Sequence, residues 1–231
     1  MNKIQVEDIT NEERNITIDK DSTIIIKNSK VKLNFDIKTN INIFLLFLDS
    51  DIELTINTQD DFILNIFSVD TSLKEIINLN QDNIKFNYTY STINKNNNRY
   101  KIDVNHLGNN IESYIVSHGI NLENDFSFTI NAKVPNEIIG VKTTQDSKII
   151  LEGGTALIKP NLLVDIDEVE ANHSAYIGSF KEDEMFYLKT RGICEKDAIK
   201  LLAKSFLIGN MSITFRERNI ILDILKRYWR W

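Results

Sequence analysis

His173 could bind a metal ion, and it stands in a strongly acidic segment. Seven carboxylates lie between Asp165 and Glu184, with Lys181 as the one cation. Neutral imidazole suits iron and other borderline metals. From the residues alone, a hydrogen-bonded histidine in a turn between a strand and a helix is the simpler interpretation. The acidic run likewise indicates a solvated turn leading into a helix rather than a surface that concentrates metal.

The other reactive side chains do not form a catalytic pattern. Asp165 and Asp167 share one face of an expected strand, as acid–base pairs sometimes do, but no Arg, Tyr or His cluster accompanies them. His106 and His118 fit turn positions better than a ligand set. The sequence has no G-x-x-x-x-G-K-[ST] loop for a nucleotide phosphate. We therefore expect no enzymatic activity and no ATP hydrolysis by this chain.

Cys194 is the single cysteine of the chain. One cysteine excludes an internal disulfide and favours a cytoplasmic location. It also cannot supply the four thiolates of a resident iron–sulfur cluster, so the isolated chain is expected to purify colourless. Cys194 precedes an expected helix, whose dipole can lower a thiol pKa, although a lone cysteine in a turn is more often a packing residue.

Size and charge describe an ordinary folded protein of 231 residues, with 42% hydrophobic and 26% charged residues. The net charge of -6 argues against nucleic acid as a partner, because phosphate binding needs a basic surface. No apolar run approaches the ~18 residues of a membrane-spanning helix. The first residues are polar and lack the apolar segment of a signal peptide.

The elements that must position these residues are mostly short strands. Their starts recur at nine- or ten-residue intervals in the first third, with polar residues between them. The expected strands there are 23–27, 31–37, 41–48, 52–57 and 62–69. Further expected strands are 84–90, 100–104, 111–116, 126–130, 138–141, 148–151 and 162–166. The period fits a sandwich, a barrel or a solenoid, and it does not distinguish between them.

Asparagine is expected to make many of the turns, because eight glycines and two prolines are few for so many strands. The asparagine-rich tract 94–98 could be a domain linker, but β character on both sides favours a loop within one domain. We expect all-β structure from about residue 20 to 166.

The last 50 residues change to a helical period. Capping-box spacings begin at Ser179 and at Thr214, and a further helix is expected over 195–208. The first helix should end at Thr190, just before Gly192. The apolar face expected on the middle helix consists of Ala198, Leu201, Leu202, Ser205 and Phe206. The stripe expected on the last helix consists of Ile220, Ile221, Ile224, Leu225, Tyr228 and Trp229.

The stretch 160–206 resembles the junction between the β core and the C-terminal helices of SufB and SufD, scaffold proteins of iron–sulfur cluster assembly. The matching positions are Pro160, Leu162, Val164, Asp167, Glu168, Val169, His173, Gly178, Glu182, Glu184, Phe186, Tyr187, Leu188, Arg191, Gly192, Ile193, Ala198, Leu201, Leu202 and Phe206. Thinner similarity extends upstream to His106, Gly108, Ser113, His118 and the family's glutamine-rich turn at 143–145. Residues 1–80 show no match, so the chain resembles a SufD shortened at its N-terminus.

This resemblance implies an all-β fold with C-terminal helices: a right-handed parallel β-helix capped by two or three α-helices. It divides the chain into a β-helix core over 1–178 and a helical region over 179–231. It also implies a SufD-like, non-catalytic subunit of a SufBCD-type scaffold complex in the cytoplasm. The expected partners are a SufC-like ABC ATPase and either a SufB-like chain or a second copy of this chain, without nucleic acid or membrane.

The resemblance makes His173 a possible ligand of a transient iron–sulfur cluster shared with a partner chain. Ala171 departs from the pattern, since many SufD sequences have cysteine there. The helices are expected to bind the ATPase through five side chains: Phe186, Tyr187, Leu201, Leu202 and Phe206. Two alternatives stay open, a purely architectural SufD-like subunit without a metal role and an unrelated β-helix protein that binds or cleaves glycans.

Overall fold

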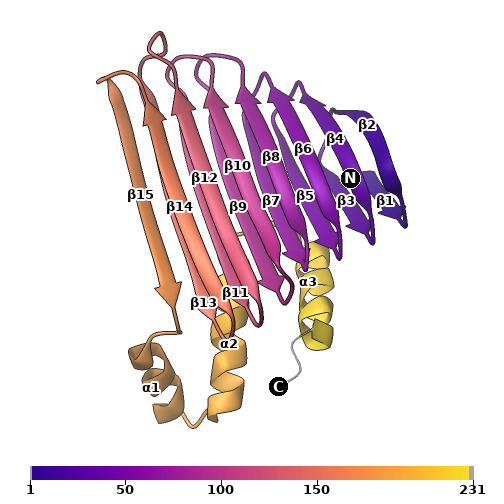
Figure 1. Cartoon of the computed structure of the whole chain (residues 1–231), viewed down its shortest axis with the longest axis vertical. Helices are drawn as coiled ribbons and strands as arrows, with labels where there is room; N and C mark the ends of the chain where they lie inside the picture. Colours follow the sequence, from indigo (N-terminus) through magenta and orange to yellow (C-terminus); the bar gives the residue numbers. More distant parts are fainter. Residues whose placement is uncertain (1, 229–231) are drawn as a thin grey trace.

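The computed structural model describes residues 2–228, which form a parallel β-helix followed by three helices (Figure 1). Successive strands alternate between two sheets, so each coil of the chain contributes one strand to each sheet. The odd-numbered sheet contains β1 (Asn2–Glu7), β3 (Ser22–Lys27), β5 (Ile41–Leu48), β7 (Phe62–Val69), β9 (Lys85–Asn94), β11 (Glu112–Asn121), β13 (Val141–Leu151) and β15 (Val169–Gly178). The even-numbered sheet contains β2 (Thr10–Ile18), β4 (Lys30–Ile37), β6 (Asp51–Thr58), β8 (Ser72–Leu79), β10 (Asn98–His106), β12 (Asp125–Val134) and β14 (Thr155–Val164).

The core lies between the two sheets. In β4 the alternating residues Val31, Leu33, Phe35 and Ile37 are all buried, as their period predicts. Equivalent residues of neighbouring coils stack on one another, as Phe62 and Phe86 do with ring centroids 4.5 Å apart. The expected parallel β-helix with helices at its C-terminal end is confirmed, and a sandwich of antiparallel sheets is excluded because every strand pairing is parallel among the described residues.

A second apolar cluster lies on the outer face of the odd-numbered sheet, where α2 and α3 cover it. Phe44, Leu46 and Phe67 of the sheet share this cluster with Leu207 of α2 and Ile221 of α3. The covered strands are therefore apolar on both faces, which explains the continuous apolar run within β5.

Asparagine and aspartate make many of the turns, as expected. Eight such residues have positive φ values between 46° and 64°, and at Asn28, Asp49 and Asp70 the backbone N–H donates to the next coil. Short side chains that bond locally make this left-handed conformation accessible. The tract 94–98 is a turn between β9 and β10, within a single β-helix.

The helices are α1 (Glu182–Thr190), α2 (Glu195–Ile208) and α3 (Phe215–Tyr228). The capping box at Thr214 is confirmed: its hydroxyl faces Glu217 Oε2 at 2.8 Å, and Glu217 N donates to Thr214 Oγ1 at 3.3 Å. The box expected at Ser179 is wrong, because the N-cap is Lys181, which makes no side-chain cap. The predicted stripe on α3 includes the buried Ile221, Ile224 and Leu225, whereas Trp229 lies outside the described residues.

Four strands were missed by the sequence prediction, and each has a physical reason. β1 and β2 form the first coil, and β15 forms the last, so one side of each has no further coil to bury it. β8 has Glu75 at a buried position, which interrupts its apolar alternation. The β structure therefore extends from residue 2 to 178 rather than from 20 to 166. The strand expected at 138–141 is wrong except for Val141, where β13 begins, and β13 contains both the expected turn at 143–145 and the expected strand at 148–151.

None of the helices in the part of the chain that the structure describes is long and apolar enough to cross a membrane.

Candidate partner-binding edge and metal-ligand position

β15 is the last strand of the odd-numbered sheet, and it pairs only with β13. The segment was expected to be an acidic turn before a helix, but residues 169–178 continue the sheet for one more strand. Its residues are exposed or half-buried on both faces because no coil follows it. One backbone edge of β15 is therefore open, and such an edge can pair with a strand of another molecule.

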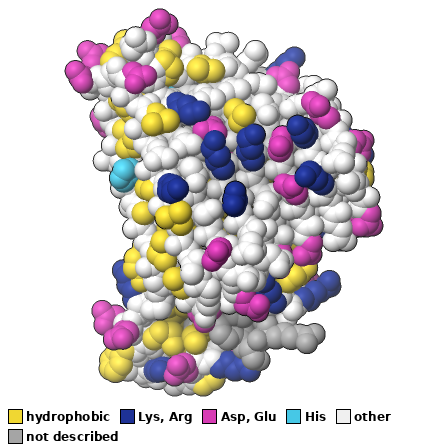
Figure 2. Space-filling model, viewed as in Figure 1, with side chains coloured by type: hydrophobic (Ala, Val, Ile, Leu, Met, Phe, Trp, Pro, Cys, Tyr) yellow, Lys and Arg dark blue, Asp and Glu magenta, His cyan; other side chains and the backbone are white. Residues whose placement is uncertain are grey.

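His173 lies in the middle of β15, so its predicted position in a turn at the strand-to-helix junction is wrong. It pairs in register with Gln145 of β13, whose side chain is fully buried inside the β-helix. Residues paired in a parallel sheet point to the same face. His173 therefore sits on the inner face of β15, where it is exposed at the open end of the β-helix. Figure 2 shows histidine at the edge of the molecule that carries the last strands.

The surroundings of His173 contain few other metal ligands. Ala171 is the preceding inner-face residue of β15, and it offers no donor atom. Glu170 has its side chain on the opposite face, where it pairs with Lys142 at 3.4 Å. Among residues 2–228, no three or more His, Cys, Asp or Glu side chains gather as a metal site. This end of the chain thus offers one imidazole, and a metal bound there would need ligands from another molecule.

Exposed apolar side chains surround the open end. Leu157 and Leu163 of β14 are 48% and 49% exposed, and Tyr176 and Ile177 of β15 are 41% and 40% exposed. Figure 2 shows hydrophobic side chains along this edge of the molecule. Apolar groups gathered beside two unpaired strand edges are typical of a protein-binding surface. We call these four residues, together with the edges of β14 and β15, the open-end surface.

The helix α1 carries the most exposed aromatic pair. None of its residues is buried, and Phe186 and Tyr187 are 70% and 57% exposed. The Arg191 guanidinium lies 5.2 Å from the centre of the Tyr187 ring. In Figure 1, α1 lies below β15 and beside α2, away from the sheets. These side chains are exposed, and their binding to a partner stays a prediction.

The remaining expected partner-binding residues lie on α2, and they differ in their exposure to solvent. Its buried face consists of Ala198, Ala203, Leu207 and Ile208. Leu201 is 46% exposed and Leu202 is half-buried. Phe206 instead packs within the chain: its ring stacks on His118 of β11 with centroids 4.4 Å apart and meets the edge of Phe180.

His118 belongs to a polar cluster that sequence reasoning missed. It was expected in a turn, but it is buried in β11, and its Nδ1 donates to the Phe206 carbonyl at 2.8 Å. Its Nε2 lies 4.0 Å from an Asp146 carboxylate oxygen, which Lys148 approaches at 2.7 Å. Ser174 of β15 donates to the other oxygen. His118, Lys148 and Ser174 lower the pKa of Asp146. Asp146 thus lies between Ser174 of the edge strand and His118, whose other ring nitrogen contacts α2.

His106 is also buried in a strand rather than placed in a turn. Its Nδ1 lies 3.1 Å from the Lys133 carbonyl and its Nε2 lies 2.9 Å from Ser113 Oγ. Burial lowers its pKa to about 4, so the ring is neutral near pH 7 and serves as an internal hydrogen-bonding group. Cys194, in contrast, is exposed before α2, where its thiol donates to Asp197 at 3.3 Å.

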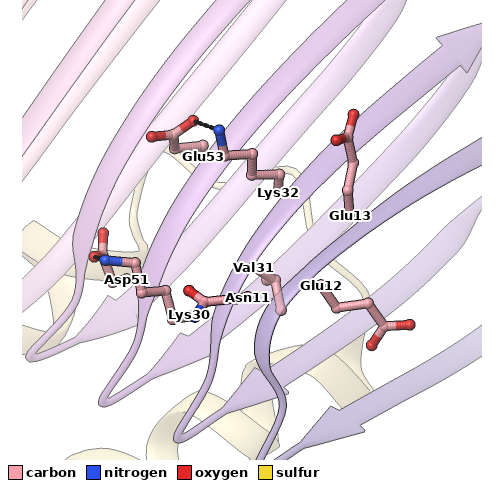
Figure 3. A pocket seen from close by; sticks show the side chains of 8 residues that line it. All are labelled: Asn11, Glu12, Glu13, Lys30, Val31, Lys32, Asp51 and Glu53. Atoms are coloured by element: carbon pink, nitrogen blue, oxygen red, sulfur yellow. Dashed lines mark ion pairs between the residues drawn. The ribbon is translucent and has the colours of Figure 1, made fainter.

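A pocket on the outer face of the even-numbered sheet lies at the other end of the β-helix (Figure 3). Its lining residues are Asn11, Glu12, Glu13, Lys30, Val31, Lys32, Asp51 and Glu53. Both lysines already have partners, since Lys30 pairs with Asp51 and Lys32 with Glu53, each at 3.2 Å. Charges that neutralise each other leave little to hold a charged ligand, so this pocket is a weak candidate site.

Comparison with known proteins gives a family match that extends from β7 through α1 into α2. Residues 64–206 match the family described as "SUF system FeS cluster assembly, SufBD core domain". The iron–sulfur cluster assembly protein SufD of Bacillus subtilis is 30% identical over 105 residues, which cover 44% of this chain and 24% of that protein. SufD of Escherichia coli is 29% identical over 69 residues, which cover 30% of this chain and 16% of that protein.

A third similarity covers a shorter segment of this chain. An iron–sulfur cluster assembly SufBD family protein of Pyrococcus horikoshii is 46% identical over 48 residues, 21% of this chain and 11% of that protein. The matched part of the chain thus spans a quarter or less of each of these three relatives. The family match itself includes more than half of the chain. This chain belongs to the SufBD core family of iron–sulfur cluster assembly proteins.

Proposed function

We propose that the chain is a SufD-like, non-catalytic subunit of a cytoplasmic SufBCD-type scaffold on which iron–sulfur clusters are assembled. The observation that carries this proposal is the open-end surface, which combines two unpaired strand edges, exposed apolar side chains and the His173 imidazole on a family core. A catalytic centre has no support from the described residues, because their buried carboxyl and imidazole groups are engaged in internal contacts.

The partner at the open-end surface is a SufB-like chain or a second copy of this chain. A strand added to the edge of β15 would satisfy its free backbone groups. Leu157, Leu163, Tyr176 and Ile177, which flank the two open edges on different faces, would then lose water where they meet the partner.

The partner at the helices is a SufC-like ABC ATPase. Phe186, Tyr187 and Leu201 support this role because they are exposed, and Leu202 extends their surface. Phe206 is left out of the contact, since its ring is already stacked on His118.

His173 would supply one ligand to the cluster, which is the cargo of the complex and not a resident group of the chain. An imidazole binds iron only as the neutral ring, so loading would release any proton that the ring carries. The partner chain must supply the remaining ligands, because Ala171 and Glu170 leave His173 without a local thiolate.

The proposal is tested with the chain, the ATPase and a SufB-like chain produced together. His173→Ala should lower the iron and sulfide content of the reconstituted complex several-fold while the three chains still co-purify. The matched control is Asn172→Ala, which changes the neighbouring residue on the opposite face of β15. Equal cluster content in wild type and His173→Ala would refute the ligand role, and failure of the chains to co-purify would refute the complex itself.

A second candidate function is a purely architectural subunit without a metal role. Ala171 is the observation in its favour, since it removes a donor from the same face as His173. Unchanged cluster content in His173→Ala, with an intact complex, is the result that this candidate requires. The glycan-binding alternative loses its support because the chain belongs to the SufBD core family.

A further inference from the structure

Gln145 and His173 are neighbours in one row of inward-facing side chains. The pairings of the odd-numbered sheet place Tyr88, Ile115, Gln145 and His173 side by side on successive strands. Adjacent strands are ~4.8 Å apart, which places the Gln145 and His173 side chains within contact range. Tyr88, Ile115 and Gln145 are fully buried, and His173 ends the row at the open end of the β-helix.

The Gln145 side chain has one unused hydrogen-bonding atom. Its Nε2 donates to the Asn161 carbonyl of β14 at 3.4 Å, and this bond fixes which way round the amide lies. Oε1 is buried and has no partner among the described residues. A buried acceptor without a donor is destabilising, so a donor beside it is favoured.

The neighbours of Gln145 leave His173 as the suitable donor. On the other side of the row Ile115 is aliphatic. Along β13 the nearest inward residues, Thr143 and Ser147, lie about 7 Å away at two residues' distance. Distance alone excludes both hydroxyls, because Thr143 Oγ1 is the acceptor in its 2.8 Å bond from Ser113 Oγ and Ser147 Oγ has no partner among the described residues. An imidazole carries an N–H in either neutral tautomer, and it can turn about its side-chain bonds toward Gln145.

We infer that Gln145 is a positioning residue for His173, whose ring N–H donates to Gln145 Oε1. The bond selects one tautomer and holds the ring plane, so that the lone pair of the other nitrogen faces away from the β-helix. Histidines that bind metals are commonly oriented by such an acceptor on the second nitrogen. The role of this ring orientation in binding iron rests on the function proposed above. The hydrogen bond between His173 and Gln145 is independent of that function.

The test is nitrogen NMR of the isolated chain with labelled histidine, with His173→Ala used to assign the signals. In wild type one neutral tautomer of His173 should predominate. Gln145→Met keeps a long apolar side chain but removes the acceptor, and it should change the tautomer ratio at least threefold. Gln145→Glu restores an acceptor and should restore the bias. The matched control is Ser147→Ala, which removes a buried, unpartnered oxygen in register with Ala175 and should leave the ratio unchanged.

An unchanged tautomer ratio in Gln145→Met would overturn the inference. A similar change in Ser147→Ala would overturn it too, because it would reveal a general loosening of β13. In the assembled complex, Gln145→Met should weaken cluster retention about 10- to 100-fold, as loss of a supporting acceptor does at other metal sites. If the NMR effect is present but His173→Ala leaves cluster content unchanged, the positioning stands and the ligand role fails.

Discussion

Glu75 is a carboxyl group enclosed in the interior of the β-helix, where it replaces an apolar core residue. Tyr88 donates a short hydrogen bond to one of its oxygens, and Tyr100 donates to the Tyr88 oxygen at 2.9 Å. The other carboxyl oxygen has no partner among the described residues. Desolvation raises the pKa of Glu75 to about 8, which keeps the group protonated near neutral pH.

Glu75 should make stability depend on pH in an unusual direction. Its pKa is about 8 in the folded chain and 4.5 in an ordinary environment, so the folded state binds more protons between these values. Its contribution to stability is therefore complete below pH 4.5, falls as pH rises, and is lost above pH 8. Glu75→Gln stays neutral and still accepts from Tyr88.

The measurement is urea unfolding of wild type and Glu75→Gln at several pH values between 5.5 and 8.5. The free energy of unfolding of wild type should fall relative to the variant by up to ~1.4 kcal/mol per pH unit. Both proteins contain His106 and Asp146, so the contributions of these two groups to the pH dependence cancel in the difference between the free energies of unfolding. Curves that stay parallel across this range would show that Glu75 does not titrate in it.

At the scale of the element, Glu217 joins the start of α3 to the sheet. One carboxylate oxygen accepts from Thr214 N, and the other accepts from Thr23 Oγ1 of β3 at 2.7 Å. Glu217 is 4% exposed, so its loss leaves several buried donors unsatisfied. Glu217→Ala should lower the free energy of unfolding by ~2 kcal/mol. The control is Asp223→Ala on the same helix, whose exposed ion pair with Lys226 is solvent-screened, so the free energy of unfolding should stay close to that of wild type.

The two phenylalanines of α1 and α2 should behave differently. Phe186→Asp should abolish ATPase binding and leave the unfolding midpoint of the chain nearly unchanged, because the ring is 70% exposed. Phe206→Asp should destabilise the chain, because it places a carboxylate against His118 and Phe180. Pull-down and thermal unfolding of both variants distinguish the roles, and normal ATPase binding by Phe186→Asp would place the contact elsewhere.

On the scale of the whole molecule, the helices and the β-helix share an apolar core. Residues 179–228, the described part of the helical region, supply one side of the cluster whose other side includes Phe44, Leu46, Phe67 and Ile120. Removing them would expose this face to water, and contiguous apolar patches of this kind cause aggregation. The fragment 1–178 is therefore expected to be insoluble, or soluble with a lower unfolding midpoint.

Expression of 1–178 beside the full chain measures this dependence, with sedimentation and urea unfolding as readouts. A soluble fragment with the unfolding midpoint of the full chain would show that the division at residue 178 separates two independent domains. That division is so far a prediction, and the shared cluster argues for cooperation between the two parts.

Features that depend on neighbours along the chain could be predicted from the amino-acid sequence alone. Alternation at 31–37 and 52–57 identified β4 and β6, and the Thr214 box identified the start of α3. Turns made by asparagine followed from the shortage of glycine. Periodicity could not distinguish a solenoid from a sandwich, and the resemblance of 160–206 to the SufBD family correctly made that choice.

Features that depend on the next coil became visible only in the folded chain. His173 and Gln145 are 28 residues apart in register, and their pairing appears in no local pattern. From the sequence, Glu75 would be assigned to the surface, but in the folded chain Tyr88 and Tyr100 enclose it. Phe206 was predicted to contact a partner, but in the folded chain its ring stacks on His118. The segment of β15 was predicted to be a turn because acidic residues precede it and His173 interrupts the apolar inner-face residues Val169, Ala171, Ala175 and Ile177. Burial in a parallel β-helix is set by the coil above and the coil below, and a residue's own neighbours in sequence do not reveal whether those coils exist.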